Sequence, residues 1–208
     1  MSALELDHVL IAVTDLDEAG RTIEAGFGVR SVAGGRHPGF GTANRIVPLG
    51  SAYLELVAVA DPVEAAASVF GRWVAGAEAG RPMGWAVRTD DLDGVARRLG
   101  LAVSPGSRAA PDGRLLAWRT AGLERAAAEP LLPFFIEWGA GTPHPGGGLD
   151  GPGIERLVLT GAQGRLEEWL GGLPDGVEVR PGPPAVSAIV LAGRATQPIG
   201  CLENPPAP

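Results

Sequence analysis

The sequence predicts an α+β protein in which two βαβββ modules form one curved mixed sheet, followed by a shorter third β-α-β-β element. Apolar, β-branched runs of strand length alternate with Ala- and Arg-containing helical segments. An acidic helix-start motif occurs twice, with Asp15 matched to Asp91, and a third, shorter strand and helix pattern follows near the C-terminus. Internal repetition of this kind predicts a duplicated supersecondary unit.

The first module is predicted over residues 4–60. An apolar run at 6–13 ends at Thr14 and Asp15, whose side-chain oxygens can cap a helix over 16–25. Gly26 and Gly28 close that helix. Three further strands are predicted at 29–33, 44–48 and 52–59, the last two separated by a Gly-Ser turn.

The second module is predicted over residues 82–138. Its helix start, Thr89-Asp90-Asp91-Leu92-Asp93, repeats Val13-Thr14-Asp15-Leu16-Asp17, again after an apolar strand. Strands are predicted at 101–104, 115–118 and 133–138. The last of these, Pro-Phe-Phe-Ile-Glu-Trp, parallels Ala-Tyr-Leu-Glu-Leu-Val at 52–57.

A shorter C-terminal repeat is predicted over residues 154–193, after a Gly/Pro-rich link at 139–153. It contains strands at 154–160, 177–180 and 186–192 and a helix at 165–170. The tail, 197–208, is rich in Pro and is expected to be a loose or docked extension.

Composition excludes several classes of protein. The chain has 208 residues and 45% hydrophobic residues, so it is globular although about a quarter of it is Gly and Pro. Its formal charge is −7, all its basic residues are Arg, and no basic block offers a surface to nucleic acid. No apolar run is long enough to span a bilayer, and Cys201 has no partner for an internal disulfide, so a soluble cytoplasmic protein is expected.

Polar residues within the apolar strands point to a site. Alternation places His8 on the face opposite Val9 and Ile11, and Glu55 on the face opposite Leu54 and Leu56. With Glu137 in the last strand of the second module, a histidine and two carboxylates are expected on the concave side of the sheet.

Each of these residues also has a structural interpretation. A lone strand histidine is commonly a hydrogen-bonded structural residue, and a strand carboxylate commonly pairs with an arginine. A carboxylate buried without a partner costs several kcal/mol, so either a divalent metal or an arginine must accompany it. Arg88, predicted on the concave side of its strand, is the available arginine.

The segment 34–45 is rich in Gly and polar residues and is predicted as a loop at the mouth of the cup. Its side chains His37, Thr42, Asn44 and Arg45 offer donors for a carboxylate or carbonyl oxygen. The alternative is a turn with incidental polarity. His144-Pro145-Gly146 repeats His37-Pro38-Gly39 in the link, where the same two interpretations apply.

Other catalytic motifs are missing from the sequence. The glycine clusters lack the strand-to-helix context of a dinucleotide fingerprint, and a chain without Lys contains no phosphate-binding Gly-Lys-Ser/Thr motif. There is no Gly-x-Ser-x-Gly nucleophile elbow. Cys201 lies near the tail with no histidine close in sequence, which argues against a thiol nucleophile.

Taken together, the paired modules resemble the vicinal oxygen chelate superfamily. The first strand with Leu6-Asp7-His8-Val9, the helix start Asp15-Leu16-Asp17 and the fourth strand with Tyr53-Leu54-Glu55-Leu56 carry this likeness. Two longer segments, at 35–44 and 133–138, resemble more closely its glyoxalase-like domain branch. The resemblance covers roughly residues 4–193.

The resemblance implies a divalent metal (Zn, Mn, Fe or Ni) held by His8, Glu55 and Glu137, whose Lewis acidity would stabilise an enolate or oxyanion. The fourth ligand position falls on Gly84, which has no side chain. Three ligands are compatible with an open catalytic site or with a site that has lost its metal.

Two functions follow from the resemblance. The first is a metal-dependent lyase, isomerase or dioxygenase acting on a small oxygenated, anionic metabolite. In it Glu55 and Glu137 are catalytic, and the expected substrate-binding residues are His37, Thr42, Asn44, Arg45 and Arg88. The second is a metal-free protein that sequesters a small molecule, as drug-binding relatives of the superfamily do. A homodimer and closure of the cup within one chain both remain open.

Overall fold

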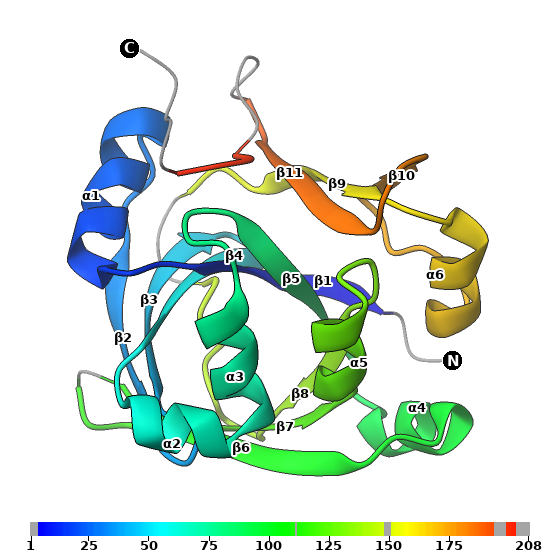
Figure 1. Ribbon diagram of the computed structural model, residues 1–208, viewed down its shortest axis with the longest axis horizontal. Coiled ribbons are helices and arrows are strands. Elements are labelled where there is room, and N and C mark those ends of the chain that lie inside the picture. Colours follow the sequence, from blue (N-terminus) through cyan, green and yellow to red (C-terminus); the bar gives the residue numbers. More distant parts are fainter. Residues whose placement is uncertain (1–3, 111, 148–150, 194–198, 203–208) are drawn as a thin grey trace.

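The computed structural model describes residues 4–110, 112–147, 151–193 and 199–202. Its main feature is a strongly curved eight-stranded mixed sheet, with a separate three-stranded sheet packed on the outside (Figure 1). The predicted α+β architecture with a curved mixed sheet and a smaller C-terminal sheet is confirmed. Within the described residues, no helix has the length and apolar character needed to cross a membrane.

The elements follow the chain in the predicted order, with additional helices. The first half contains β1 (Glu5–Ala12), α1 (Leu16–Phe27), β2 (Val32–His37), β3 (Thr42–Leu49), β4 (Ala52–Val59), α2 (Pro62–Ala67) and α3 (Val69–Gly76). The second half contains β5 (Pro82–Arg88), α4 (Leu92–Leu99), β6 (Val103–Ala109), β7 (Leu115–Ala121), α5 (Leu123–Ala128) and β8 (Phe134–Trp138). The C-terminal unit contains β9 (Ile154–Thr160), α6 (Gln163–Leu170), β10 (Val177–Arg180) and β11 (Ala185–Leu191).

The repeated helix-start motif caps the N-terminus of a helix in both copies, as predicted. The Asp15 carboxylate accepts a hydrogen bond from the backbone N–H of Glu18, and Asp91 accepts one from Gly94. Both helices end at a glycine in the left-handed region, Gly28 at φ 63° and Gly100 at φ 64°. Local sequence therefore sets both ends of α1 and α4.

The eight-stranded sheet is built from two similar halves, in the order β2-β3-β4-β1-β5-β8-β7-β6. β1 and β5 pair antiparallel at its centre, while β4 and β8 run parallel to them on either side. The two edge strands approach each other, because a Cβ on Gly35 of β2 would lie 2.5 Å from the carbonyl oxygen of Ala109 in β6. The sheet is therefore nearly closed into a barrel with an interior.

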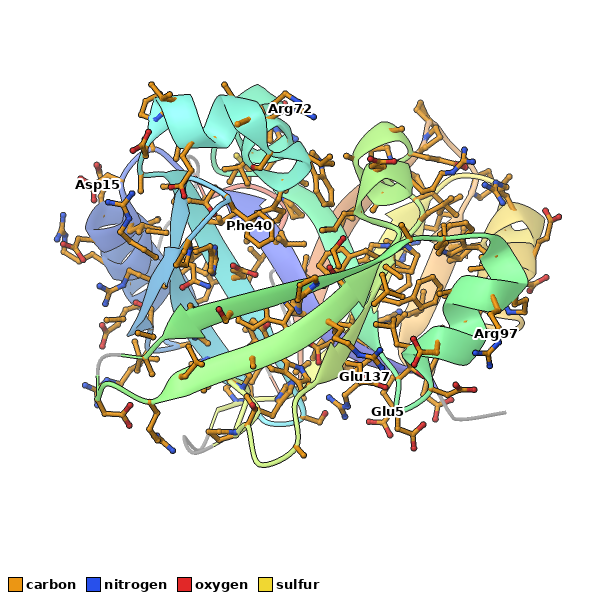
Figure 2. The ribbon with its side chains drawn as sticks, turned by 90° about the horizontal axis from the view of Figure 1, so that it is seen from below. Glu5, Asp15, Phe40, Arg72, Arg97 and Glu137 are labelled. Carbon is orange, nitrogen blue, oxygen red and sulfur yellow. The ribbon has the colours of Figure 1, made fainter. Side chains whose placement is uncertain are left out.

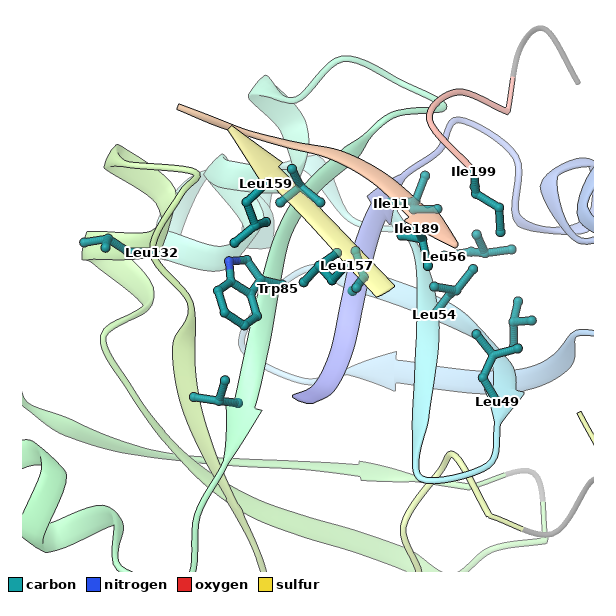
Figure 3. Close-up of a cluster of buried hydrophobic side chains, with 14 of the residues drawn as sticks. Ile11, Leu49, Leu54, Leu56, Trp85, Leu132, Leu157, Leu159, Ile189 and Ile199 are labelled. Atoms are coloured by element: carbon teal, nitrogen blue, oxygen red, sulfur yellow. The ribbon is translucent and has the colours of Figure 1, made fainter. Parts of the chain in front are cut away.

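The outer face of the barrel carries the larger apolar core. Strands β9 and β11 lay Leu157, Leu159 and Ile189 over Ile11, Trp85 and their neighbours in the centre of the main sheet (Figure 3). Within the predicted tail, residues 199–202 are docked. Ile199 pairs with Ile189, and the buried Leu202 donates its N–H to the carbonyl of Gly80. The rest of the predicted tail, 197–198 and 203–208, lies outside the described residues.

Two details differ from the predicted elements. β2 lies at 32–37, not 29–33, and runs through Gly34 and Gly35, so the expected mouth loop is mostly a β2–β3 hairpin with a turn at 38–41. Helices α2, α3 and α5 were not predicted. Two of them have only six residues, too short for a helical period to stand out in the sequence.

Candidate functional site

The interior of the barrel contains a small cavity of about 50 Å³ that is open to solvent. Its wall is mostly aromatic and aliphatic, with a small group of polar side chains, which is the usual composition of a small-molecule site. The polar lining residues are His8, His37, Asn44, Tyr53, Glu55, Arg108 and Thr120, and the apolar ones are Phe40, Ile46, Phe70, Trp118, Leu123, Phe134, Ile136, Trp138 and Pro145.

Glu55 is the acidic residue of this wall. It lies in β4 between Leu54 and Leu56, which pack in the outer core, so strand alternation turns its carboxylate inward as predicted. The side chain is buried, with 6% of the residue exposed. Its Oε1 accepts a hydrogen bond of 2.8 Å from the Asn44 amide, while His8 Nε2 lies 3.5 Å from Oε2.

His8 is held from behind by the residue before it. The pairing of β1 with β5 shifts register between Leu6 and His8, at Asp7. Asp7 Oδ1 lies 2.6 Å from His8 Nδ1, and Asp7 is completely buried. The His8 ring also stacks on Tyr53, with a centroid distance of 4.6 Å. An N–H on Nδ1 facing Asp7 leaves Nε2 directed toward Glu55.

Asp7 accepts two further hydrogen bonds, both on Oδ2. The Trp138 indole N–H donates over 3.0 Å, and His144 Nε2 lies 2.9 Å away. The backbone N–H of Gly146 donates to His144 Nδ1, so the proton of a neutral His144 sits on Nε2 and is donated to Asp7. The second His-Pro-Gly segment thus holds the first-strand carboxylate.

These contacts keep Asp7 ionised. Burial alone would raise the pKa of Asp7, but hydrogen bonds from His144 and His8 outweigh burial and hold the pKa well below its ordinary value. Nearby Tyr53 shows the opposite shift, because burial and the charges of Asp7 and Glu55 raise the pKa of its phenol. Tyr53 is therefore neutral and Asp7 is charged throughout the physiological range.

The β2–β3 hairpin supplies three of the predicted substrate-binding residues. His37 Nε2 lies 3.7 Å from Glu55 Oε1, and its Nδ1 lies 2.9 Å from the Thr42 hydroxyl. Burial lowers the pKa of His37 below its ordinary value, partly offset by the charge of Glu55. Asn44 is oriented by the backbone N–H of Gly35, which donates to its Oδ1. His37 and Asn44 line the cavity, and Thr42 is buried behind His37.

Two glycines of this hairpin, Gly34 and Gly35, allow close packing within the protein. A Cβ on Gly34 would lie 1.9 Å from the amide oxygen of Asn44. Gly34 therefore makes room for the residue that binds Glu55, and Gly35 makes room for β6.

Glu137 is not in the cavity, which corrects the predicted equivalence with Glu55. In β8 the inward residues are Phe134, Ile136 and Trp138, so Glu137 faces outward and binds Arg119, with a distance of 2.8 Å to Nε. In Figure 2 Glu137 and the cavity residue Phe40 lie in separate parts of the molecule. A shift of one residue in matching the two strands produces this difference.

Two predicted substrate-binding arginines also lie away from the cavity. Arg45 pairs with Asp17 of α1 at 2.7 Å and bonds the Ser31 hydroxyl. Arg88, at the end of β5, binds the carboxylate of Glu5 and the carbonyl of Ser51. These contacts hold Arg88 at the end of its strand, and neither Glu55 nor Glu137 has Arg88 as its partner.

Arg108 of β6 is the arginine that lies at the cavity. It lines the cavity with 5% of its surface exposed. Burial lowers the pKa of its guanidinium, opposed by the charge of Glu55. Its Nη1 has no hydrogen-bond partner and is the only buried side-chain nitrogen or oxygen in that state among the described residues.

The donor set does not fit the predicted metal. With Glu137 outside and glycine at position 84, His8 and Glu55 are the only two of the predicted ligands that meet. Within the ranges that the structure describes, no three His, Cys, Asp or Glu side chains are arranged to hold a metal ion. A Cβ on Gly84 would lie 2.4 Å from the Trp73 ring, so an aromatic side chain fills the space where a fourth ligand was expected.

Comparison with known proteins decides the family. The sequence profile described as "Glyoxalase-like domain" matches residues 6–173, most of the chain. The chain belongs to the glyoxalase-like domain family. This confirms the resemblance to the glyoxalase-like domain branch that the segments at 35–44 and 133–138 carry. A search of curated proteins gives no match.

A solved structure shares this fold, and two others are similar over part of it. A hypothetical protein from Staphylococcus aureus is similar with a TM-score of 0.72 at 14% identity, covering 90% of each chain. Methylmalonyl-CoA epimerase from Mycobacterium tuberculosis gives 0.46 at 23% identity, covering 64% of this chain and 86% of the epimerase. A single-residue variant of the Streptomyces coelicolor epimerase, in complex with 2-nitronate-propionyl-CoA, gives 0.49 at 20% identity and covers 69% of this chain and 99% of that one. The structural similarity to the two epimerases is too low for their sites to be compared with this one.

Three site residues were missed from the sequence. Asp7 directly precedes His8, but strict alternation places it on the opposite face, and only the register shift brings it to the site. His144 carried a signal, the repeated His-Pro-Gly segment. Arg108 carried none, because its strand, Val-Ser-Pro-Gly-Ser-Arg-Ala, has no apolar alternation from which to read a face.

Proposed function

We propose that this glyoxalase-like protein is an enzyme that moves a proton on a small oxygenated anion held inside the barrel. Glu55 accepts the proton from a carbon atom next to a carbonyl group. The carbon–hydrogen bond breaks, its electron pair moves into the carbonyl to give an enolate, and the proton then returns to carbon or to the enolate oxygen. This is chemistry of the isomerase and lyase type.

The observation that carries the proposal is the Glu55 carboxylate in a mostly apolar cavity. One of its oxygens accepts a hydrogen bond, and the other has no hydrogen-bond donor within ideal distance. Asn44 binds Oε1 of Glu55, whereas Oε2 has His8 Nε2 at 3.5 Å, beyond ideal hydrogen-bond distance. A general base needs this combination of orientation and limited solvation. His8, oriented by Asp7, stands close enough to receive the proton from Glu55 after small movements.

No step of this proposal uses a metal ion, since the described side chains of the cavity do not form a metal-binding site. A general base alone typically supplies 10²- to 10⁴-fold of rate acceleration. The remainder has to come from groups that stabilise the enolate, and Arg108 is a charged donor in the wall of the cavity.

The experiment is exchange of carbon-bound protons with solvent. Pyruvate, 2-oxobutyrate and phenylpyruvate are incubated with the protein in D₂O, and loss of the proton signal next to the carbonyl is followed by NMR. We expect exchange above the protein-free rate for at least one of them, reduced at least 100-fold in Glu55→Gln. Glu137→Gln, which alters a carboxylate outside the cavity, is the matched control and should exchange at the native rate.

The alternative is a metal-free binding protein, and the aromatic wall of the cavity favours it. Phe40, Phe70, Trp118, Phe134 and Trp138 can hold a planar apolar molecule without any chemistry. In that case a ligand binds, but neither it nor the 2-oxo acids exchange protons, and Glu55→Gln changes affinity only. The exchange experiment therefore separates the two functions.

A further inference from the structure

Arg108 is the most unusual polar residue of the molecule. It projects from β6, near the closure of the barrel against β2, and its Nη1 is buried without a partner. In contrast, the nearby polar groups are mutually satisfied, since Asp7 binds two histidines and Trp138, and Glu55 binds Asn44. Glu55 has His8 Nε2 at 3.5 Å and His37 Nε2 at 3.7 Å, whereas Arg108 does not lie within ion-pair distance of it.

A buried donor without a partner destabilises the folded protein. The penalty is about 1–3 kcal/mol for a neutral group and more for a charged one. A guanidinium cannot escape it by losing its proton, because arginine stays charged in proteins. Because Arg108 also lines the cavity, a ligand bound there can supply an acceptor to its guanidinium and so offset the penalty.

The ligand that fits carries one negative charge on a flat group of oxygens. A guanidinium binds a carboxylate through parallel N–H donors, with geometry matched to its two oxygens. Glu55 lines the same cavity and would repel a second negative charge. The wall also includes nine aromatic, aliphatic or proline side chains, and these suit a ligand whose body is apolar.

We infer that Arg108 is the carboxylate-binding residue of the cavity, and that the ligand is a small monocarboxylate with a planar or branched apolar body. The carboxylate lies on Arg108, and the body packs against Trp118 and Phe134. This inference rests on the proposed function for the identity of the site. It adds the charge and class of the molecule that the site receives.

The test uses benzoate, with benzamide as its neutral counterpart of equal shape and phthalate as a dianion. Binding to the full-length chain is measured by isothermal titration calorimetry. We expect benzoate to bind at least tenfold more tightly than benzamide or phthalate. Equal affinity for benzoate and benzamide, or no binding of benzoate, overturns the inference.

Variants then assign the effect to the residue. Arg108→Gln is expected to weaken benzoate binding at least tenfold and to leave benzamide unchanged. Arg97→Gln is the control, because Arg97 is an exposed arginine on helix α4 (Figure 2). Unchanged benzoate affinity in Arg108→Gln contradicts the inference.

Thermal stability is a second readout. Loss of Arg108 should lower the melting temperature if the residue serves the fold, and should not lower it if the residue serves ligand binding. Arg108→Met removes an unpartnered buried charge and keeps the length of the side chain, so the ligand-free variant should melt at the same or a higher temperature than the native chain. A melting temperature lowered by several degrees, with benzoate affinity retained, shows that Arg108 serves the fold instead.

The two proposals fail separately. Benzoate has no exchangeable proton next to a carbonyl, so its binding does not depend on Glu55 acting as a base. Benzoate binding that requires Arg108, without exchange of any 2-oxo acid, leaves this inference standing and removes the proposed proton transfer.

Discussion

Replacing Asp7 with asparagine tests whether this buried carboxylate organises the site. Asp7 receives N–H groups from His8 at 2.6 Å, His144 at 2.9 Å and Trp138 at 3.0 Å. Asparagine has almost the same shape but only one acceptor oxygen, and it places an amide donor where the second oxygen stood. At least one hydrogen bond is therefore lost, and the charge that strengthens the others disappears.

The size of the effect follows from these contacts. Hydrogen bonds to a charged group contribute about 1.5–3 kcal/mol each, so losing one and weakening the rest should lower the free energy of unfolding by about 2–4 kcal/mol. The loss should be smaller below about pH 4. The pKa of Asp7 is lowered in the folded chain, so its stabilisation is present above the unfolded value and declines as pH falls.

The assay is urea-induced unfolding followed by circular dichroism at pH 7. Asp112→Asn is the matched control, because Asp112 is an exposed carboxylate bonded to Arg114 and should change stability by less than about 1 kcal/mol. If Asp7→Asn costs no more than this control, the three contacts do not hold the site together and the reasoning is wrong.

Two further predictions concern the hairpin that carries half of the site. Because burial lowers the pKa of His37, protonation favours the unfolded chain, so stability should fall as pH drops below about 6.5. The urea midpoint should fall between pH 7.5 and pH 5.5 in the native chain and fall less in His37→Gln. An equal fall in the two proteins would contradict the prediction. Gly35→Ala should lower stability by about 1–3 kcal/mol through collision with the Ala109 carbonyl. Gly164→Ala, in open space on α6, should stabilise the chain by about 0.5–1 kcal/mol, and identical effects at the two glycines would refute the close approach of β2 and β6.

The inward faces of the central strands could be predicted from sequence. Apolar alternation placed His8 and Glu55 correctly, because Val9, Ile11, Leu54 and Leu56 pack together in the outer core. The same rule excludes Glu137, which alternates with Phe134 and Ile136. Its predicted role came from matching two strands one residue out of register, and a one-residue shift turns a side chain to the other face.

The remaining site residues depend on contacts that no local pattern specifies. Asp7 reaches the site through a register shift, which depends on how β1 pairs with β5. Arg108 comes from an edge strand without periodicity, brought to the cavity by the closure of β6 against β2. Arg45 and Arg88 had suitable chemistry, but nearby acidic residues on the outside pair with them instead.

The most direct test of the central claim, that the barrel interior is the ligand site, is a crystal structure of the chain with benzoate. We predict the benzoate carboxylate within hydrogen-bond distance of Arg108 Nη1, with its ring between Trp118 and Phe134 and its edge toward Glu55. Benzoate bound elsewhere, for example at Arg88 on the outside, with an empty barrel interior, would contradict the claim that the barrel interior is the ligand site and the role of Arg108 in it.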